Sequence, residues 1–165
     1  MNIYLIGMPG SGKTTLGKQL AQELNYSFVD MDEEIEKSER KTINEIFAEE
    51  GEEEFRDIEQ DTLHEIATGK NLVVATGGGV PCFFDNMQFI NRSGMSIFID
   101  VSAKELHKRI ASNTDRPMFL YKTPQEIETE LSNKITSRLP FYSQAQITVT
   151  GDNIQLEDLI GGLEG

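Results

Sequence analysis

The amino-acid sequence predicts a doubly wound, three-layer α/β/α fold. Short apolar segments alternate along the chain with longer segments that have the spacing of amphipathic helices. The apolar segments are continuous rather than alternating, which is typical of parallel strands buried on both faces. The first of them runs directly into a glycine-rich loop and a helix. The predicted strands cover residues 3–6, 27–29, 72–75, 97–99 and 147–149.

Local signals mark where the predicted helices begin and end. Residues 42–45, 102–105 and 123–126 each read as a capping box, in which a Ser or Thr is followed three residues later by Glu. Pro124 stands at the first position of its helix, where a missing N–H costs nothing. Gly51 is a typical helix stop. The predicted helices cover residues 13–24, 43–51, 52–68, 103–111 and 156–163, with a further helix beginning at 124.

Length and composition limit the class of protein. A chain of 165 residues corresponds to one domain, so residues 1–165 are expected to form a single unit. It has 15 Lys and Arg against 28 Asp and Glu, a net charge of −13, which argues against nucleic-acid binding. The lone Cys82 excludes an internal disulfide. We expect a cytoplasmic protein, because the sequence has neither an apolar run long enough to span a bilayer nor a signal peptide.

Residues 7–14 read G-M-P-G-S-G-K-T and match the phosphate-binding pattern G-x-x-x-x-G-K-[ST] in full. The glycines allow backbone N–H groups to surround an anion, and the helix start adds the positive end of its dipole. Lys13 can reach the β- and γ-phosphates of a nucleotide, and the Thr14 hydroxyl can bind Mg²⁺. The alternative is a glycine-rich turn with an incidental lysine. The predicted nucleotide-binding residues of the loop are Gly10, Ser11, Gly12, Lys13, Thr14 and Thr15.

Asp30 and Asp32 follow the predicted strand 27–29 and, in an extended segment, point to the same side. One carboxylate can hold Mg²⁺ through water, and the other can accept a proton or a hydrogen bond from a substrate hydroxyl. The alternative is that Asp32 only caps a helix over residues 33–38 and that Asp30 is a solvated turn residue. We assign Mg²⁺ to Thr14 directly and to Asp30 through water.

Three successive glycines, Gly77, Gly78 and Gly79, end the predicted strand 72–75 at the sheet edge where ligands bind in such folds. Their missing side chains favour close approach of backbone to a ligand, although a flexible turn is the alternative. The arginines Arg56, Arg109, Arg116 and Arg138, taken singly, are typical surface cations. The polar segment 112–123, which contains Arg116, is the best candidate for a mobile lid loop.

Taken in order, these motifs resemble the shikimate kinase family over nearly the whole chain. The resemblance rests on Lys13 in its loop, Asp30-x-Asp32, the stretch 51–56 (G-E-E-E-F-R), the glycine triplet, Arg116-Pro117 and Arg138-x-Pro140-x-Tyr142. It implies a five-stranded parallel sheet of the nucleoside-monophosphate-kinase type and a substrate-binding helical region at about residues 32–61. It also implies transfer of the γ-phosphate of ATP to the 3-hydroxyl of shikimate, with Mg²⁺, on the route to chorismate and aromatic amino acids.

The resemblance also assigns roles to individual residues. Asp32 would meet the substrate hydroxyls as the candidate base, and Arg56 and Arg138 would hold the shikimate carboxylate. The glycine triplet would supply backbone contacts to shikimate. Arg116 would join Lys13 at the phosphates when the lid closes. Arg109 would lie near the adenine, and Phe47 and Phe55 would line the shikimate pocket.

Two alternatives remain open from the sequence. Gluconate is also a polyhydroxy carboxylate, so a gluconokinase-like enzyme of the same fold could use similar arginines. An ATP-binding module without phosphotransfer would share the phosphate loop only. Nothing in the sequence demands more than a monomer.

Overall fold

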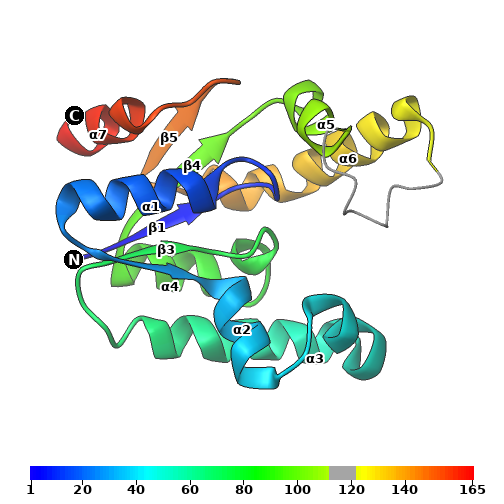
Figure 1. Cartoon of the computed structure of the whole chain (residues 1–165), viewed down its shortest axis with the longest axis horizontal. Helices are drawn as coiled ribbons and strands as arrows, with labels where there is room; N and C mark the ends of the chain where they lie inside the picture. Colours follow the sequence, from blue (N-terminus) through cyan, green and yellow to red (C-terminus); the bar gives the residue numbers. More distant parts are fainter. Residues whose placement is uncertain (112–121) are drawn as a thin grey trace.

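The structure, a computed structural model, describes residues 1–111 and 122–165 (Figure 1). Within these residues the chain forms a parallel sheet of five strands in the order β2-β3-β1-β4-β5. The strands are β1 (Asn2–Ile6), β2 (Ser27–Asp30), β3 (Leu72–Ala75), β4 (Gly94–Asp100) and β5 (Ile147–Thr150). The predicted fold class and strand positions are confirmed. Only β4 differs much, since it begins at Gly94, where it pairs with Asn2 of β1.

Helices cover both faces of this sheet, as the continuous apolar strands predict. α1 (Lys13–Leu24) and α7 (Leu156–Glu164) pack against each other and against the sheet, whereas α4 (Asn86–Ser93) and α6 (Pro124–Tyr142) belong to the opposite layer. Every residue of β1 is buried, because the central strand has neighbours on all sides. No helix among the described residues has the length and apolar character needed to cross a membrane.

α2 (Met31–Glu39) and α3 (Ile43–Ile66) form a separate helical layer beside the sheet, in the lower part of Figure 1. Ile35, Ile46 and Phe55 form a small buried cluster between them, distinct from the main core. α3 spans both helices predicted at 43–51 and 52–68, but Gly51 has φ 86° and ψ 169° and interrupts it. The predicted break at Gly51 is therefore confirmed as a sharp bend inside one element.

The strand order brings several loops to one edge of the sheet. The chain leaves β1 toward β2 and β3 on one side, and later reaches β4 and β5 on the other. Where the connections that follow two neighbouring parallel strands lead to opposite sides of the sheet, a crevice forms at the carboxyl ends of these strands. The loop after β1, the start of α2 and the segment after β3, including η1 (Val80–Cys82), meet there, and α5 (Ala103–Ala111) lies beside them (Figure 1).

Candidate functional site

The loop between β1 and α1 is wound tightly around an open space. Gly10 and Gly12 have φ of 84° and 102°, a conformation that residues with a Cβ rarely adopt. At Gly7 an added Cβ would lie 2.7 Å from the carbonyl oxygen of Ile99, so only glycine fits. The Lys13 ammonium donates hydrogen bonds to the carbonyl oxygens of Gly7 (2.6 Å) and Met8 (3.1 Å). The lysine is therefore held inside the loop, as a phosphate-binding lysine must be.

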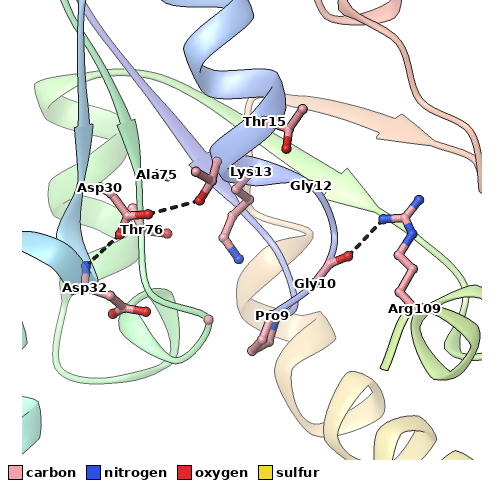
Figure 2. Close-up of a pocket in the computed structure, with 12 residues that line it drawn as sticks. Pro9, Gly10, Gly12, Lys13, Thr15, Asp30, Asp32, Ala75, Thr76 and Arg109 are labelled. Carbon is pink, nitrogen blue, oxygen red and sulfur yellow. Dashed lines mark hydrogen bonds between the residues drawn. The ribbon is translucent and has the colours of Figure 1, made fainter. Parts of the chain in front are cut away.

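A cavity of about 490 Å³ opens in front of this loop. Figure 2 shows Lys13 at its centre, with Asp30 and Asp32 on one side and Arg109 on the other. Arg109 donates to the carbonyl oxygens of Gly10 (2.9 Å) and Asp152 (3.1 Å). The lining residues are Pro9, Gly10, Gly12, Lys13, Thr14, Thr15, Asp30, Asp32, Ala75, Thr76, Gly78 and Arg109.

Asp30 ends β2 and caps α2. One oxygen of its carboxylate accepts from the backbone N–H of Asp32 (3.0 Å) and of Glu33 (3.3 Å), and the other accepts from the Thr14 hydroxyl at 3.0 Å. The alternative in which Asp32 caps the helix is therefore wrong, because Asp30 holds that position and α2 begins at Met31. Thr14 and Asp30 place two oxygen donors side by side at the mouth of the phosphate loop, and Mg²⁺ prefers oxygen ligands.

Asp32 lies in the first turn of α2, and its side chain is accessible from the cavity. The surrounding protein atoms restrict its solvation, and this raises the pKa of the Asp32 carboxyl. The neighbouring Asp30 raises the pKa further, whereas Lys13 and Arg56 oppose the change. An accessible carboxyl with a raised pKa is a better proton acceptor than an ordinary aspartate.

Neighbouring side chains leave little space for a Cβ at the three glycines after β3, and none of the three has a positive φ. A Cβ at Gly77 would lie 3.0 Å from an Asp32 oxygen, and a Cβ at Gly78 would lie 2.8 Å from Nη1 of Arg138. A Cβ at Gly79 would clash with the Arg56 guanidinium. The triplet thus brings a carboxylate from α2, an arginine from α3 and an arginine from α6 to one short stretch of backbone. Asp32, Arg56 and Arg138 converge there, as expected from the sequence.

Arg56 is held by groups on its own helix. Nη1 donates to the Glu59 carboxylate at 2.7 Å, and Nη2 lies 3.4 Å from Glu52. Glu59 is only 2% exposed, and this burial raises the pKa of its carboxyl to about 7 in spite of the ion pair with Arg56. Nε of Arg56 is buried and has no hydrogen-bond partner among the residues that the structure describes.

Arg138 is fixed by Tyr142, one turn further along α6. The Tyr142 hydroxyl accepts from Nη1 of Arg138 (3.4 Å) and donates to the carbonyl oxygen of Gly78 at 2.6 Å. Burial raises the pKa of Tyr142 to about 12, so the hydroxyl keeps the proton that it donates. Tyr142 therefore ties the arginine of α6 to the glycine triplet.

The remaining predicted residues differ in their surroundings. Phe55 is buried and Phe47 is 37% exposed, with their ring centroids 4.6 Å apart on either side of the α3 bend. The Ser11 hydroxyl is buried inside the phosphate loop. Arg116 and most of the predicted lid, residues 112–121, lie outside the described residues.

Sequence reasoning missed three residues that shape this site. Glu59 stands three residues after Arg56 on the same helix face, a spacing that could have indicated the ion pair. Tyr142 belongs to the motif that carries the resemblance, yet no role was predicted for it. Phe83, whose ring centroid is 4.1 Å from Cζ of Arg56, follows the glycine triplet without any sequence signal.

Known proteins resemble this chain over its whole length. The shikimate kinase family model matches residues 9–160. A shikimate kinase of Parabacteroides distasonis is 42% identical over 156 residues, which are 94% of this chain and 90% of that protein. The crystal structure of shikimate kinase from Bacteroides thetaiotaomicron has a TM-score of 0.95 at 39% identity and covers 100% of this chain and 99% of that one.

A further solved structure, shikimate kinase from Acinetobacter baumannii in complex with shikimate, has a TM-score of 0.87 at 34% identity. It covers 99% of this chain and 90% of that one. The chain belongs to the shikimate kinase family.

Proposed function

We propose that the crevice between the phosphate loop and the glycine triplet is where this chain transfers the γ-phosphate of ATP to the 3-hydroxyl of shikimate. The reaction is that of a shikimate kinase and uses ATP with Mg²⁺. The observation that supports this site is the convergence of Asp32, Arg56 and Arg138 on Gly77–Gly79, beside the loop that holds Lys13. An acceptor bound by the arginines would therefore face the phosphate end of a nucleotide.

At the nucleotide end, the phosphates are bound by backbone N–H groups of the loop and the helix start, from Gly10 to Thr15, and by the Lys13 ammonium. Thr14 and Asp30 would hold Mg²⁺, Thr14 directly and Asp30 through water. The ion supplies charge neutralisation on the phosphate oxygens. Arg109 lies at the far side of the cavity from the aspartates and is assigned to the adenine end.

At the acceptor end, the guanidinium groups of Arg56 and Arg138 pair with the shikimate carboxylate, since planar guanidinium forks match carboxylates. Phe47 and Phe55 line the pocket, and Asp32 accepts the proton of the attacking hydroxyl. The bond from that oxygen to the γ-phosphorus forms while the bond from the γ-phosphorus to the bridging oxygen of ADP breaks. Lys13 balances the developing negative charge, and Arg116 is assigned to the same task from the lid segment.

The experiment that tests this proposal is ADP release measured with shikimate, gluconate or AMP as acceptor. We expect ADP release with shikimate as the acceptor and none with gluconate or AMP. Turnover with gluconate would support a related kinase. ATP binding without turnover on any of the acceptors would support a module without phosphotransfer.

Asp32→Asn is the most informative variant, because the amide cannot accept the proton. We expect kcat to fall about 10²- to 10⁴-fold while ATP binding is kept. Asp61→Asn, which changes an exposed carboxyl on α3, is the matched control and should behave as the wild type. A fully active Asp32→Asn protein would refute the assignment of Asp32.

We further propose that residues 1–165 act as one kinase domain and as a monomer in the cytoplasm, without nucleic-acid or membrane partners. In support, one chain supplies the phosphate loop, both aspartates and the acceptor arginines. The net charge of −13 would repel a phosphate backbone. Size-exclusion chromatography with light scattering tests the oligomeric state.

A further inference from the structure

The guanidinium of Arg56 lies against the ring of Phe83. Cζ of Arg56 is 4.1 Å from the Phe83 ring centroid, closer than the 5.3 Å to Phe55 and the 5.8 Å to Phe47. Phe55 and Phe47 belong to α3, the helix that carries Arg56. Phe83 instead comes from the segment that follows the glycine triplet, so it joins the arginine to a different part of the crevice.

Hydrogen bonds hold the segment that carries Phe83 in one conformation. The N–H of Cys82 donates to the carbonyl oxygen of Gly79 (3.0 Å), and the N–H of Asn86 donates to that of Phe83 (3.2 Å). The Asn86 side chain, which is fully buried, donates to the carbonyl oxygen of Val80 at 2.9 Å. A ring on such a segment is a fixed surface rather than a mobile cover.

The Phe83 ring restricts the orientation of the guanidinium plane, which the ion pairs of Arg56 do not. Glu59 and Glu52 contact the two terminal nitrogens and hold that edge of the guanidinium. A contact at an edge still allows the plane of the group to tilt. A cation over an aromatic face is attracted to that face, and a planar guanidinium can stack on it. The Phe83 contact therefore limits the tilt of the group.

We infer that Phe83 is a positioning residue for the acceptor, acting through Arg56: its ring fixes the guanidinium so that Arg56 meets the substrate carboxylate beside Gly79. The inference rests on the proposed function, in which Arg56 binds that carboxylate. Phe83 makes no contribution to the phosphoryl transfer itself. Its loss should weaken acceptor binding and leave the chemical step unchanged.

The experiment compares Phe83→Leu with Phe83→Tyr in steady-state kinetics. Leucine removes the aromatic face, and we expect the KM for shikimate to rise roughly 3- to 30-fold, the range of a cation–π contact. The kcat and the KM for ATP should stay within about twofold of wild type, allowing for measurement error. Phe83→Tyr keeps the ring and should restore the wild-type KM. Phe84→Leu, which changes the adjacent ring that is 55% exposed, is the matched control.

A second comparison tests whether Phe83 acts through Arg56. In an Arg56→Ala background, Phe83→Leu should raise the KM for shikimate no further, because the guanidinium that Phe83 positions is no longer present. An additional increase there, or a wild-type KM in Phe83→Leu, would overturn the inference. If Phe83→Leu fails to fold by circular dichroism, Phe83→Met is measured instead, and the same outcomes decide.

The wild-type assay separates the two hypotheses. If the wild type shows no shikimate-dependent ADP release, the proposed function itself is wrong. If the wild type is active and Phe83→Leu keeps its KM for shikimate, only the role of Phe83 is wrong.

Discussion

Asp32 and Glu59 approach Gly77 from two different helices and differ in their access to solvent. A Cβ at Gly77 would lie 3.0 Å from an oxygen of Asp32 and 2.9 Å from one of Glu59. Restricted solvation raises the pKa of both carboxyls. Asp32 faces the cavity beside Lys13, where a proton acceptor is useful, whereas Glu59 is buried behind Arg56. Restricted solvation therefore acts both on a carboxyl that lines the cavity and on a buried carboxyl that holds Arg56.

The Glu59 carboxyl is predicted to make stability depend on pH. Its pKa is about 7 in the folded chain and 4.5 without burial, so between these values the folded chain binds a proton that the unfolded chain releases. The contribution of this group is fully present below pH 4.5 and is lost as the pH rises through about 7. The loss is on the order of 3 kcal/mol.

The measurement is the free energy of unfolding of wild type and Glu59→Gln from pH 5 to pH 8. We expect the wild type to lose stability relative to Glu59→Gln over this range. Glu65→Gln, an exposed change on the same helix, should show the same pH dependence of the unfolding free energy as the wild type. If the difference in unfolding free energy between wild type and Glu59→Gln stays constant with pH, the prediction is wrong.

At the scale of elements, the bend in α3 brings together Phe47 and Phe55, the two rings proposed to line the acceptor pocket. Gly51 separates the two halves of the helix, and Phe47 and Phe55 pack together across it. Its φ of 86° and ψ of 169° fall in a region that is essentially restricted to glycine, and a Cβ there would meet nothing within 4 Å. Glycine is needed at Gly51 for its backbone conformation, in contrast to the triplet, where neighbouring side chains leave little space for a Cβ.

Gly51→Ala is predicted to destabilise the α2–α3 layer without a steric clash. The strained backbone should cost about 1–3 kcal/mol of unfolding free energy, measured by urea denaturation. We expect a higher KM for shikimate and an unchanged KM for ATP, since the phosphate loop is on another element. Gly161→Ala in α7 also has an open Cβ position but no positive φ, and it should be neutral or slightly stabilising. Equal effects of the two variants would refute the role of the bend.

At the scale of the whole molecule, an acidic body surrounds a cationic crevice. The net charge is −13, yet Lys13, Arg56, Arg109 and Arg138 all lie at the carboxyl edge of the sheet. Both substrates are anions, so long-range repulsion opposes the local attraction. The contacts inside the crevice are shorter than a Debye length and are screened less than the distant surface charges.

Ionic strength is therefore expected to change kcat/KM for shikimate, mainly through KM. Raising salt from about 10 to 100 mM should lower the KM roughly two- to fivefold, because screening weakens the repulsion first. Steady-state kinetics in a non-interacting salt, with kcat as the internal control, measures this effect. A KM that stays constant over the range would contradict it.

Much of this fold could be predicted from local sequence, because strands, caps and the phosphate loop are encoded by neighbouring residues. The helix starts at Thr42 and Thr123 are confirmed by hydrogen bonds from the N–H three residues later. The first part of β4 was missed, since residues 94–96 lack an apolar run and are ordered by pairing with β1. Asp30 could not be separated from Asp32 as the cap from the sequence, because both lie at the start of the same helix.

The candidate site was predictable only as a set of residue types. The aspartates, arginines and glycines stand out by motif, but the contacts that orient them join distant parts of the chain. The Tyr142 hydroxyl donates to the carbonyl oxygen of Gly78, 64 residues away in the sequence, and the Phe83 ring contacts Arg56 of α3. Such contacts depend on how layers pack, which local spacing does not determine.

The order in which the cations occur along the chain has a consequence for synthesis. Lys13 is made early, but Arg138 comes near the end of the sequence, on a helix that must dock before the acceptor end is complete. A growing chain that stops short of α6 holds the phosphate loop without the second arginine. Leu131 and Tyr142 of the same helix belong to the main hydrophobic core, so neither the core nor the acceptor end is complete until α6 has been made.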